Sequence, residues 1–176
     1  TAQNVTLFDH SCFVKYQVEG RDALQVLNRV CANLIDVPVG RVVYTQWLNH
    51  KGGIEADVTV TRLSETAFLI VSIAASQTRD KIWIERNIPE GAYCFVFDAT
   101  SGLSMLTLMG PNARSLLSEV ACEDLSDNAF PFGTSREIEI GHATVRATRL
   151  TYVGELGWEL FVPTEMVQYV YDRLHK

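Results

Sequence analysis

Residues 16–30, "YQVEGRDALQVLNRV", and residues 106–120, "LTLMGPNARSLLSEV", are two versions of one pattern, and together they decide the fold. Four identities recur at a constant offset of 90 residues: Gly20 with Gly110, Ala23 with Ala113, Leu27 with Leu117, and Val30 with Val120. Each copy has a strand-like start, a glycine turn, and apolar residues spaced by three and four, which is typical of an amphipathic helix. We therefore expect an internal duplication built on a strand–turn–helix unit.

The residues that follow each copy repeat the same order of patterns. Strands are expected over residues 41–49, 54–63 and 67–73 of the first half and over 135–140, 143–152 and 157–162 of the second. Helices are expected over residues 74–87 and 164–175, and a further strand over 93–100. The sequence thus predicts an α+β protein with two related sheet-plus-helix halves, residues 1–90 and 91–176, and a ligand cleft where they meet.

Composition excludes several classes of function. The formal charge is −6 and no more than two Lys or Arg residues are consecutive, so a nucleic-acid partner is not expected. No apolar run approaches the ~20 residues of a membrane-spanning helix, so no membrane partner is expected either. The four cysteines and four histidines are scattered without ligand spacing. A metal site is therefore not indicated.

Asp57 lies in the strand expected after the turn "NHKGG", residues 49–53. Strand alternation places Ala56 and Val58 on one face and Asp57 with Thr59 on the other. Two interpretations stay open from the pattern alone. Asp57 belongs to the solvent-facing polar side of a half-buried sheet, or its carboxylate faces a cationic or proton-donating ligand in a cleft.

Glu159 stands inside the apolar run "GWELFV", residues 157–162. Alternation puts Trp158 and Leu160 on one side of the strand and Glu159 with Phe161 on the other. Either an exposed acid lies beside an exposed aromatic ring, or Phe161 and Glu159 line a pocket together with Tyr152. In the second case the carboxylate can accept two parallel N–H bonds, an arrangement that suits the edge of an amino-pyrimidine.

The stretches "NHKGGIEADVTVTRL" (49–63) and "RLTYVGELGWELFVP" (149–163) resemble the folate-binding module of the glycine-cleavage T-protein (aminomethyltransferase) family. "FDHSCFVKYQVEGRDA" (8–23) and "LSMLTLMGPNARSLL" (103–117) are similar to that family too. "EDLSDNAFPF" (123–132), followed by "YVGELGWEL", looks closest to the C-terminal part of sarcosine and dimethylglycine dehydrogenases. The resemblance covers essentially the whole chain.

This resemblance implies the glycine-cleavage T-protein folate-binding fold and a role in one-carbon transfer. Tyr152 and Glu159 would bind the pteridine of tetrahydrofolate, the implied cofactor. Asp57 would be catalytic, because it can orient the folate amine, relay its proton and stabilise cationic intermediates. The partners would be folate and an iminium derived from an N-methyl amine, and the product 5,10-methylenetetrahydrofolate. Asp57 and Glu159 would then converge on one pocket.

In the dehydrogenases a flavin domain precedes this module, so FAD would belong to a part of the parent enzyme outside this chain. An arginine-containing segment and a C-terminal barrel-like domain would follow it. We therefore expect weak folate binding and little turnover by these 176 residues alone. Bacterial cytoplasm and mitochondrial matrix are both compatible. The alternative is a non-catalytic regulatory module like the regulatory subunit of pyruvate dehydrogenase phosphatase. A folate-dependent RNA-modification role is disfavoured by the acidic charge.

Overall fold

The chain forms two compact units in the computed structural model, which describes residues 2–175. The continuous unit runs from Phe13 to Thr100. The split unit combines the N-terminal segment up to Cys12 with the chain from Ser101 onward. Thr1, the first residue of the predicted half 1–90, and Lys176, the last residue of the predicted half 91–176, lie outside the described residues.

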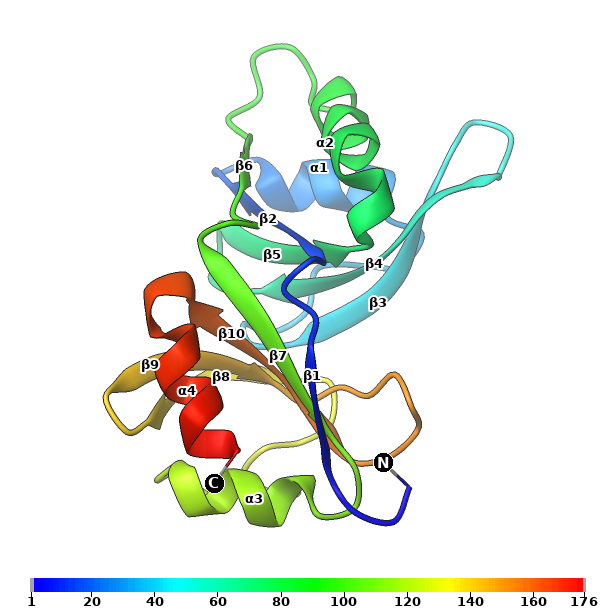
Figure 1. Cartoon of the computed structure of the whole chain (residues 1–176). Coiled ribbons are helices and arrows are strands. Elements are labelled where there is room, and N and C mark those ends of the chain that lie inside the picture. Colours follow the sequence, from blue (N-terminus) through cyan, green and yellow to red (C-terminus); the bar gives the residue numbers. More distant parts are fainter. Residues whose placement is uncertain (1, 176) are drawn as a thin grey trace. The chain divides into compact units, whose positions relative to one another are not determined.

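The continuous unit is a five-stranded antiparallel sheet with its helices on one face (Figure 1). The strand order is β3 (Val42–Leu48), β4 (Ile54–Arg62), β5 (Ala67–Ser72), β2 (Val14–Glu19) and β6 (Phe95–Asp98). The helices are α1 (Ala23–Val30) and α2 (Gln77–Arg86), which follows the short 3-10 turn η1 (Ala74–Ser76). Leu27 of α1 and Ile84 of α2 are buried against Tyr16 and Ile70 of the sheet. Apolar residues on one helix stripe and one sheet face thus form a single core.

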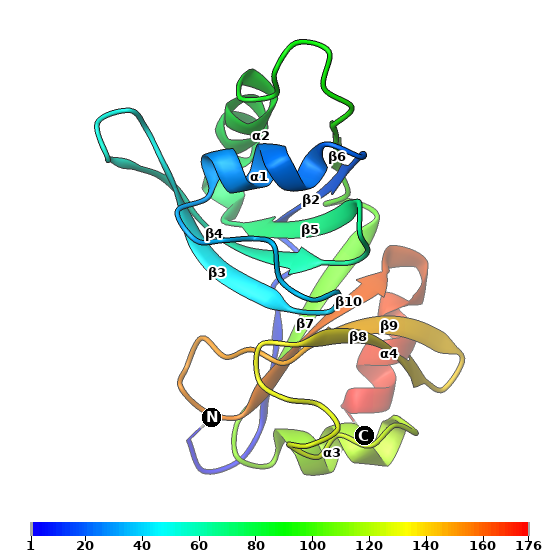
Figure 2. The ribbon, with the colours of Figure 1, turned by 180° about the vertical axis from the view of Figure 1, so that it is seen from behind.

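The split unit repeats this plan. Its sheet has the order β1 (Thr6–Asp9), β7 (Leu103–Met109), β10 (Gly157–Pro163), β9 (Ala143–Thr148) and β8 (Ser135–Ile140). Its helices are α3 (Ala113–Val120) and α4 (Val167–Leu174), with η2 (Thr164–Met166) before α4. Figure 2 shows α3 and α4 near each other along this sheet. Leu117 and Val170 of the helices are buried with Leu108, Trp158 and Leu160 of the sheet.

The two edge strands are exchanged relative to the repeat. β1 precedes the first copy of the pattern but pairs with β7 of the second, and β6 precedes the second copy but pairs with β2 of the first. The compact units therefore do not coincide with the contiguous halves 1–90 and 91–176 expected from the repeat. Backbone hydrogen bonds decide which sheet an edge strand joins, and the order of strands in the sequence does not encode these bonds.

The expected elements are present at close to their expected bounds, with two exceptions. The strand expected over 143–152 ends at Thr148, where the N–H of Leu150 donates back to the carbonyl of Thr148 at 3.1 Å in a tight turn. β1 was not expected from the sequence. The α+β class and the two related sheet-plus-helix arrangements are confirmed. Across residues 2–175, none of the helices has the length and hydrophobicity required to cross a bilayer.

Candidate functional site

Glu159 lies in the middle of the split unit's sheet, on β10. Its neighbours directly across the sheet are Thr107 on β7 and Thr148 on β9. Trp158 and Leu160 belong to the core beneath the helices, so alternation turns Glu159 and Phe161 to the opposite face, as expected. The side chains of Glu159 and Phe161 are only 1% and 2% exposed. The interpretation of an exposed acid beside an exposed ring is therefore wrong.

The carboxylate of Glu159 is electrostatically unusual. Burial raises the pKa of Glu159 to about 7, and a hydrogen bond with Tyr152 acts in the opposite direction. Oε1 of Glu159 is buried and has no hydrogen-bond partner within the described part of the chain. A buried acceptor without a donor costs about 1–3 kcal/mol, and a charged one costs more. Chemically, Oε1 can accept hydrogen bonds from N–H donors.

Tyr152 lies on the loop between β9 and β10, and its side chain is 55% exposed. Because it contacts Glu159 from an exposed position, an aromatic surface and a buried acid belong to one site. Both residues were expected from the sequence, and the structure brings them together. Thr107 was not expected to belong to this site. Its polar side chain among the apolar residues of β7 is the one pattern that could have indicated it.

Asp57 lies on β4 of the continuous unit and is exposed. Both of its carboxylate oxygens accept hydrogen bonds from β3. The Tyr44 hydroxyl donates to Oδ2 at 2.7 Å, and Nε2 of Gln46 donates to Oδ1 at 3.0 Å. The bond to Asp57 is the main cause that raises the pKa of the Tyr44 hydroxyl. Asp57 is therefore held in a defined orientation before any ligand binds.

The turn between β3 and β4 sets this register. The N–H groups of Lys51 and Gly53 donate to Oδ1 of Asn49 at 2.9 and 3.0 Å, and the Asn49 amide donates to Glu55. The pairing then shifts by one residue, because Leu48 pairs with Ile54 but Trp47 pairs with Ala56, and this irregularity puts Gln46 directly opposite Asp57. The sequence pattern does not indicate Tyr44 and Gln46 as partners of Asp57. A regular register continued from this turn would place Asp57 opposite Thr45, so alternation alone does not indicate these two partners.

The two predicted parts of the site thus belong to different units. Tyr152 and Glu159 lie in the split unit, and Asp57 lies in the continuous unit. Their convergence on one ligand stays a prediction. Chemically, the Glu159 group can recognise adjacent N–H donors, and the Asp57 group offers an oriented carboxylate that can accept a proton or stabilise positive charge.

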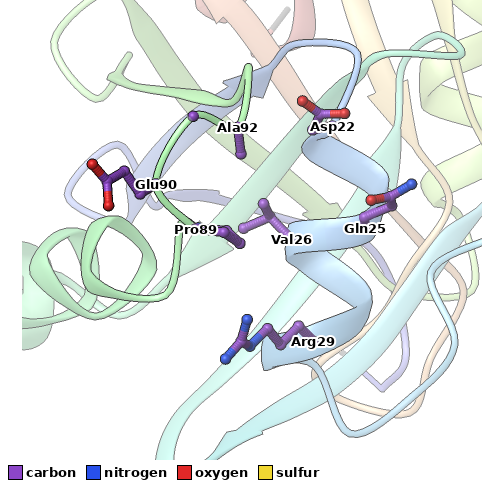
Figure 3. Close-up of a pocket in the computed structure, with 8 residues that line it drawn as sticks. Asp22, Gln25, Val26, Arg29, Pro89, Glu90 and Ala92 are labelled. Atoms are coloured by element: carbon purple, nitrogen blue, oxygen red, sulfur yellow. The ribbon is translucent and has the colours of Figure 1, made fainter.

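A separate pocket of about 400 Å³ lies between α1 and the loop that precedes β6 (Figure 3). It is lined by Asp22, Gln25, Val26 and Arg29 on one side and by Pro89, Glu90, Gly91 and Ala92 on the other. The Asp22 carboxylate already accepts the N–H of Tyr93 at 2.7 Å, and in Figure 3 the Glu90 carboxylate extends away from α1. No residue expected to act on a ligand lines this pocket, so it is not the candidate site.

The chain is similar in sequence to an oxidase, a dehydrogenase and a regulatory subunit. It is 40% identical over 172 residues to 4-methylaminobutanoate oxidase (formaldehyde-forming) of Paenarthrobacter nicotinovorans, which covers 98% of this chain and 21% of that protein. It is 35% identical to mitochondrial dimethylglycine dehydrogenase of Rattus norvegicus, with 98% and 20% covered. It is also 32% identical to the mitochondrial pyruvate dehydrogenase phosphatase regulatory subunit of Mus musculus, with 97% and 20% covered. The chain thus spans about a fifth of the length of these relatives.

Structure comparison agrees with the sequence comparison. The crystal structure of the glycine cleavage system aminomethyltransferase T from Bartonella henselae superposes with a TM-score of 0.86 at 27% identity. The match covers 99% of this chain and 46% of that protein. The GCVT N-terminal domain matches residues 1–176, from one end of the sequence to the other. The chain therefore belongs to the glycine cleavage T-protein family, as a GCVT N-terminal domain.

Proposed function

We propose that this chain is the tetrahydrofolate-binding module of an amine-oxidising enzyme of the sarcosine or dimethylglycine dehydrogenase type. The observation that supports this most directly is the buried carboxylate of Glu159, 1% exposed and with Oε1 unpaired within the described residues. An amino-pyrimidine ring presents two adjacent N–H donors, and one carboxylate can accept both. The residues at Glu159 therefore fit the pteridine of a reduced folate.

Each residue has a separate role in this proposal. Glu159 accepts the N–H groups of the pteridine, and the exposed ring of Tyr152 packs against it while its hydroxyl holds the carboxylate. Asp57, oriented by Tyr44 and Gln46, accepts or relays a proton and stabilises positive charge near the reacting amine. The folate, when bound, supplies the nucleophilic amine that captures a one-carbon unit as 5,10-methylenetetrahydrofolate. That unit would come from the iminium of an N-methyl amine oxidised elsewhere in the parent enzyme, and its original carbon–nitrogen bond would break to release the demethylated amine.

The setting of the module follows from its relatives. The mammalian ones are mitochondrial by name and others are bacterial, so we place this protein in a mitochondrial matrix or a bacterial cytoplasm. The flavin that oxidises the amine would be bound by another part of the parent chain. Folate and the iminium are then the partners of this module, and neither a nucleic acid nor a membrane is required.

A second candidate function is a non-catalytic regulatory one. The pyruvate dehydrogenase phosphatase regulatory subunit of mouse is 32% identical over nearly the whole chain. A regulatory module can keep the scaffold without keeping ligand chemistry. Asp57 with its two hydrogen bonds and Glu159 with its unpaired oxygen favour the folate-binding function over this alternative.

Calorimetric titration with 5-formyltetrahydrofolate separates the two functions. We expect binding by the wild-type chain and a loss of about 10- to 100-fold in Glu159→Gln, because two charge-assisted hydrogen bonds are weakened. Glu155→Gln, on the same loop as Tyr152, is the matched control and should bind as the wild type does. If wild-type chain and parent enzyme both fail to bind the folate, the regulatory function replaces this proposal.

Asp57 is tested by turnover rather than by affinity. In the parent enzyme, Asp57→Asn should lower the rate of methylenetetrahydrofolate formation at least 100-fold, since general acid–base catalysis contributes roughly 10²–10⁴-fold. The affinity for folate should change much less. Equal turnover in the variant and the wild type would remove Asp57 from the mechanism.

A further inference from the structure

Four side chains form a series of contacts that reaches Glu159 through Tyr152 and Thr107, and the proposed function uses only one of them. They are Phe8, His10, Thr107 and Tyr152, and we refer to them as the His10 cluster. His10 directly follows β1, and its backbone N–H donates to the carbonyl of Met105 at 2.8 Å. This bond extends the pairing of β1 with β7 by one residue. His10 is therefore held by the sheet, although it lies outside the strand.

The imidazole of His10 connects the sheet to the ring of Tyr152. It stacks on Phe8 with ring centroids 5.5 Å apart and an interplanar angle of 15°. It meets the Tyr152 ring edge-on, with centroids 6.4 Å apart and an angle of 89°. Edge-to-face and stacked pairs in this distance range are favourable arrangements of aromatic rings. Because Tyr152 lies on an exposed loop, a neighbour fixed to the sheet limits the positions that its ring can occupy.

The same imidazole holds a hydroxyl beside the carboxylate. Nδ1 of His10 lies 2.9 Å from Oγ1 of Thr107, whose side chain is fully buried. Thr107 is directly opposite Glu159 in the antiparallel pair of β7 and β10. Directly opposed residues have their Cβ atoms about 4.5–5.5 Å apart, so the hydroxyl and the carboxylate are neighbours on one face.

We propose that His10 is a positioning residue of the Glu159 site. It fixes the Tyr152 ring and the Thr107 hydroxyl at two sides of the carboxylate, so that Oε1 stays directed toward an incoming ligand. This inference rests on the proposed function for the identity of that ligand, a reduced folate. It adds a residue from the N-terminal strand segment to a site otherwise built from residues 101–175. The hydrogen bond and the two ring contacts are separate parts of the role, and they can be removed separately.

Three variants separate these parts. His10→Phe keeps an aromatic ring but loses the bond to Thr107, Thr107→Val removes the same bond from the other side, and His10→Asn keeps a polar atom but loses the ring. His142→Phe is the matched control, because His142 stacks on Tyr169 at 6.0 Å, in the same unit but away from Glu159. Each of the three variants should weaken 5-formyltetrahydrofolate binding about 2- to 10-fold, the range of a single hydrogen bond or aromatic pair. The control should bind as the wild type does.

A second measurement does not depend on folate. In ligand-free protein with ¹³C-labelled tyrosine, the Tyr152 ring resonance, assigned with Tyr152→Phe, should shift in His10→Asn and stay unchanged in His142→Phe. If the wild type binds no folate but this shift occurs, the proposed function fails and the positioning of Tyr152 by His10 is still supported. If the wild type binds folate, and His10→Phe, Thr107→Val and His10→Asn bind it equally with no shift of Tyr152, the inference is overturned.

Discussion

The buried carboxylate of Glu159 imposes a cost on the stability of the folded chain. An acid in the middle strand of a sheet, 1% exposed, loses hydration that its contact with Tyr152 only partly replaces. A glutamine would fit the same volume without a charge to desolvate. The carboxylate is therefore best explained by what it can bind, and its cost should be measurable in the ligand-free protein.

The pH dependence of stability measures that cost. Burial raises the pKa of Glu159 from 4.5 to about 7, so the folded chain binds more protons than the unfolded chain between these pH values. The contribution of Glu159 to the free energy of unfolding should therefore fall by up to ~3 kcal/mol as the pH rises from 4.5 to 7. Urea denaturation of the wild type and of Glu159→Gln across this interval gives the difference directly. Glu155→Gln should keep the wild-type slope, and an identical slope in Glu159→Gln would contradict the assignment.

At the scale of elements, the glycine turn between strand and helix is the feature that the duplication preserves. Gly20 and Gly110 both adopt a φ of 135°, in each copy of the pattern. At Gly20 a Cβ atom would lie 2.0 Å from the carbonyl oxygen of Tyr93, just before β6. The glycine thus allows α1 to begin. It also leaves room for the backbone at Tyr93, just before β6, to pass close to the turn.

Replacing Gly20 tests this reason. Gly20→Ala should lower the free energy of unfolding by about 3 kcal/mol or more, because it combines backbone strain with a clash against main-chain atoms that cannot move away. Gly91→Ala is the control: its φ is 80°, but a Cβ atom there would meet nothing within 4 Å, so only about 1 kcal/mol of strain is expected. Thermal or urea unfolding of both variants is sufficient. Equal losses would show that the close approach to Tyr93 contributes nothing.

At the scale of the whole molecule, two units with the same strand order each have a core of their own. Leu27 of α1 and Leu117 of α3 occupy equivalent positions of the repeat, and both are fully buried. Each packs with the sheet of its own unit. The duplication is therefore a duplication of a complete sheet-plus-helix core, and equivalent substitutions should have equivalent effects.

Leu27→Ala and Leu117→Ala should each cost about 2–5 kcal/mol, the range for removing a buried leucine side chain. In each variant, amide hydrogen exchange should accelerate in the strands of the unit that carries the change. Leu34→Ala, at a side chain that is 68% exposed, is the control and should change stability by less than about 0.5 kcal/mol. A buried leucine whose replacement leaves exchange in its own sheet unchanged would contradict the assignment of these cores.

The sequence by itself determined the duplication and the helices and strands other than β1, because periods of two and near 3.6 residues reflect local backbone geometry. Alternation along β10 also placed Glu159 on the face of the strand away from Trp158, and alternation along β4 placed Asp57 on the face away from Val58. Only the tertiary structure decided that Glu159 is buried, since alternation is the same for a covered and an uncovered face. Only the tertiary structure paired β1 with β7 and β6 with β2, and brought His10 to Thr107. The two strand pairs join residues about 80 to 100 positions apart through backbone hydrogen bonds, which form between most residue types and so leave little trace in the sequence. The side-chain bond between His10 and Thr107 depends on the pairing of β1 with β7.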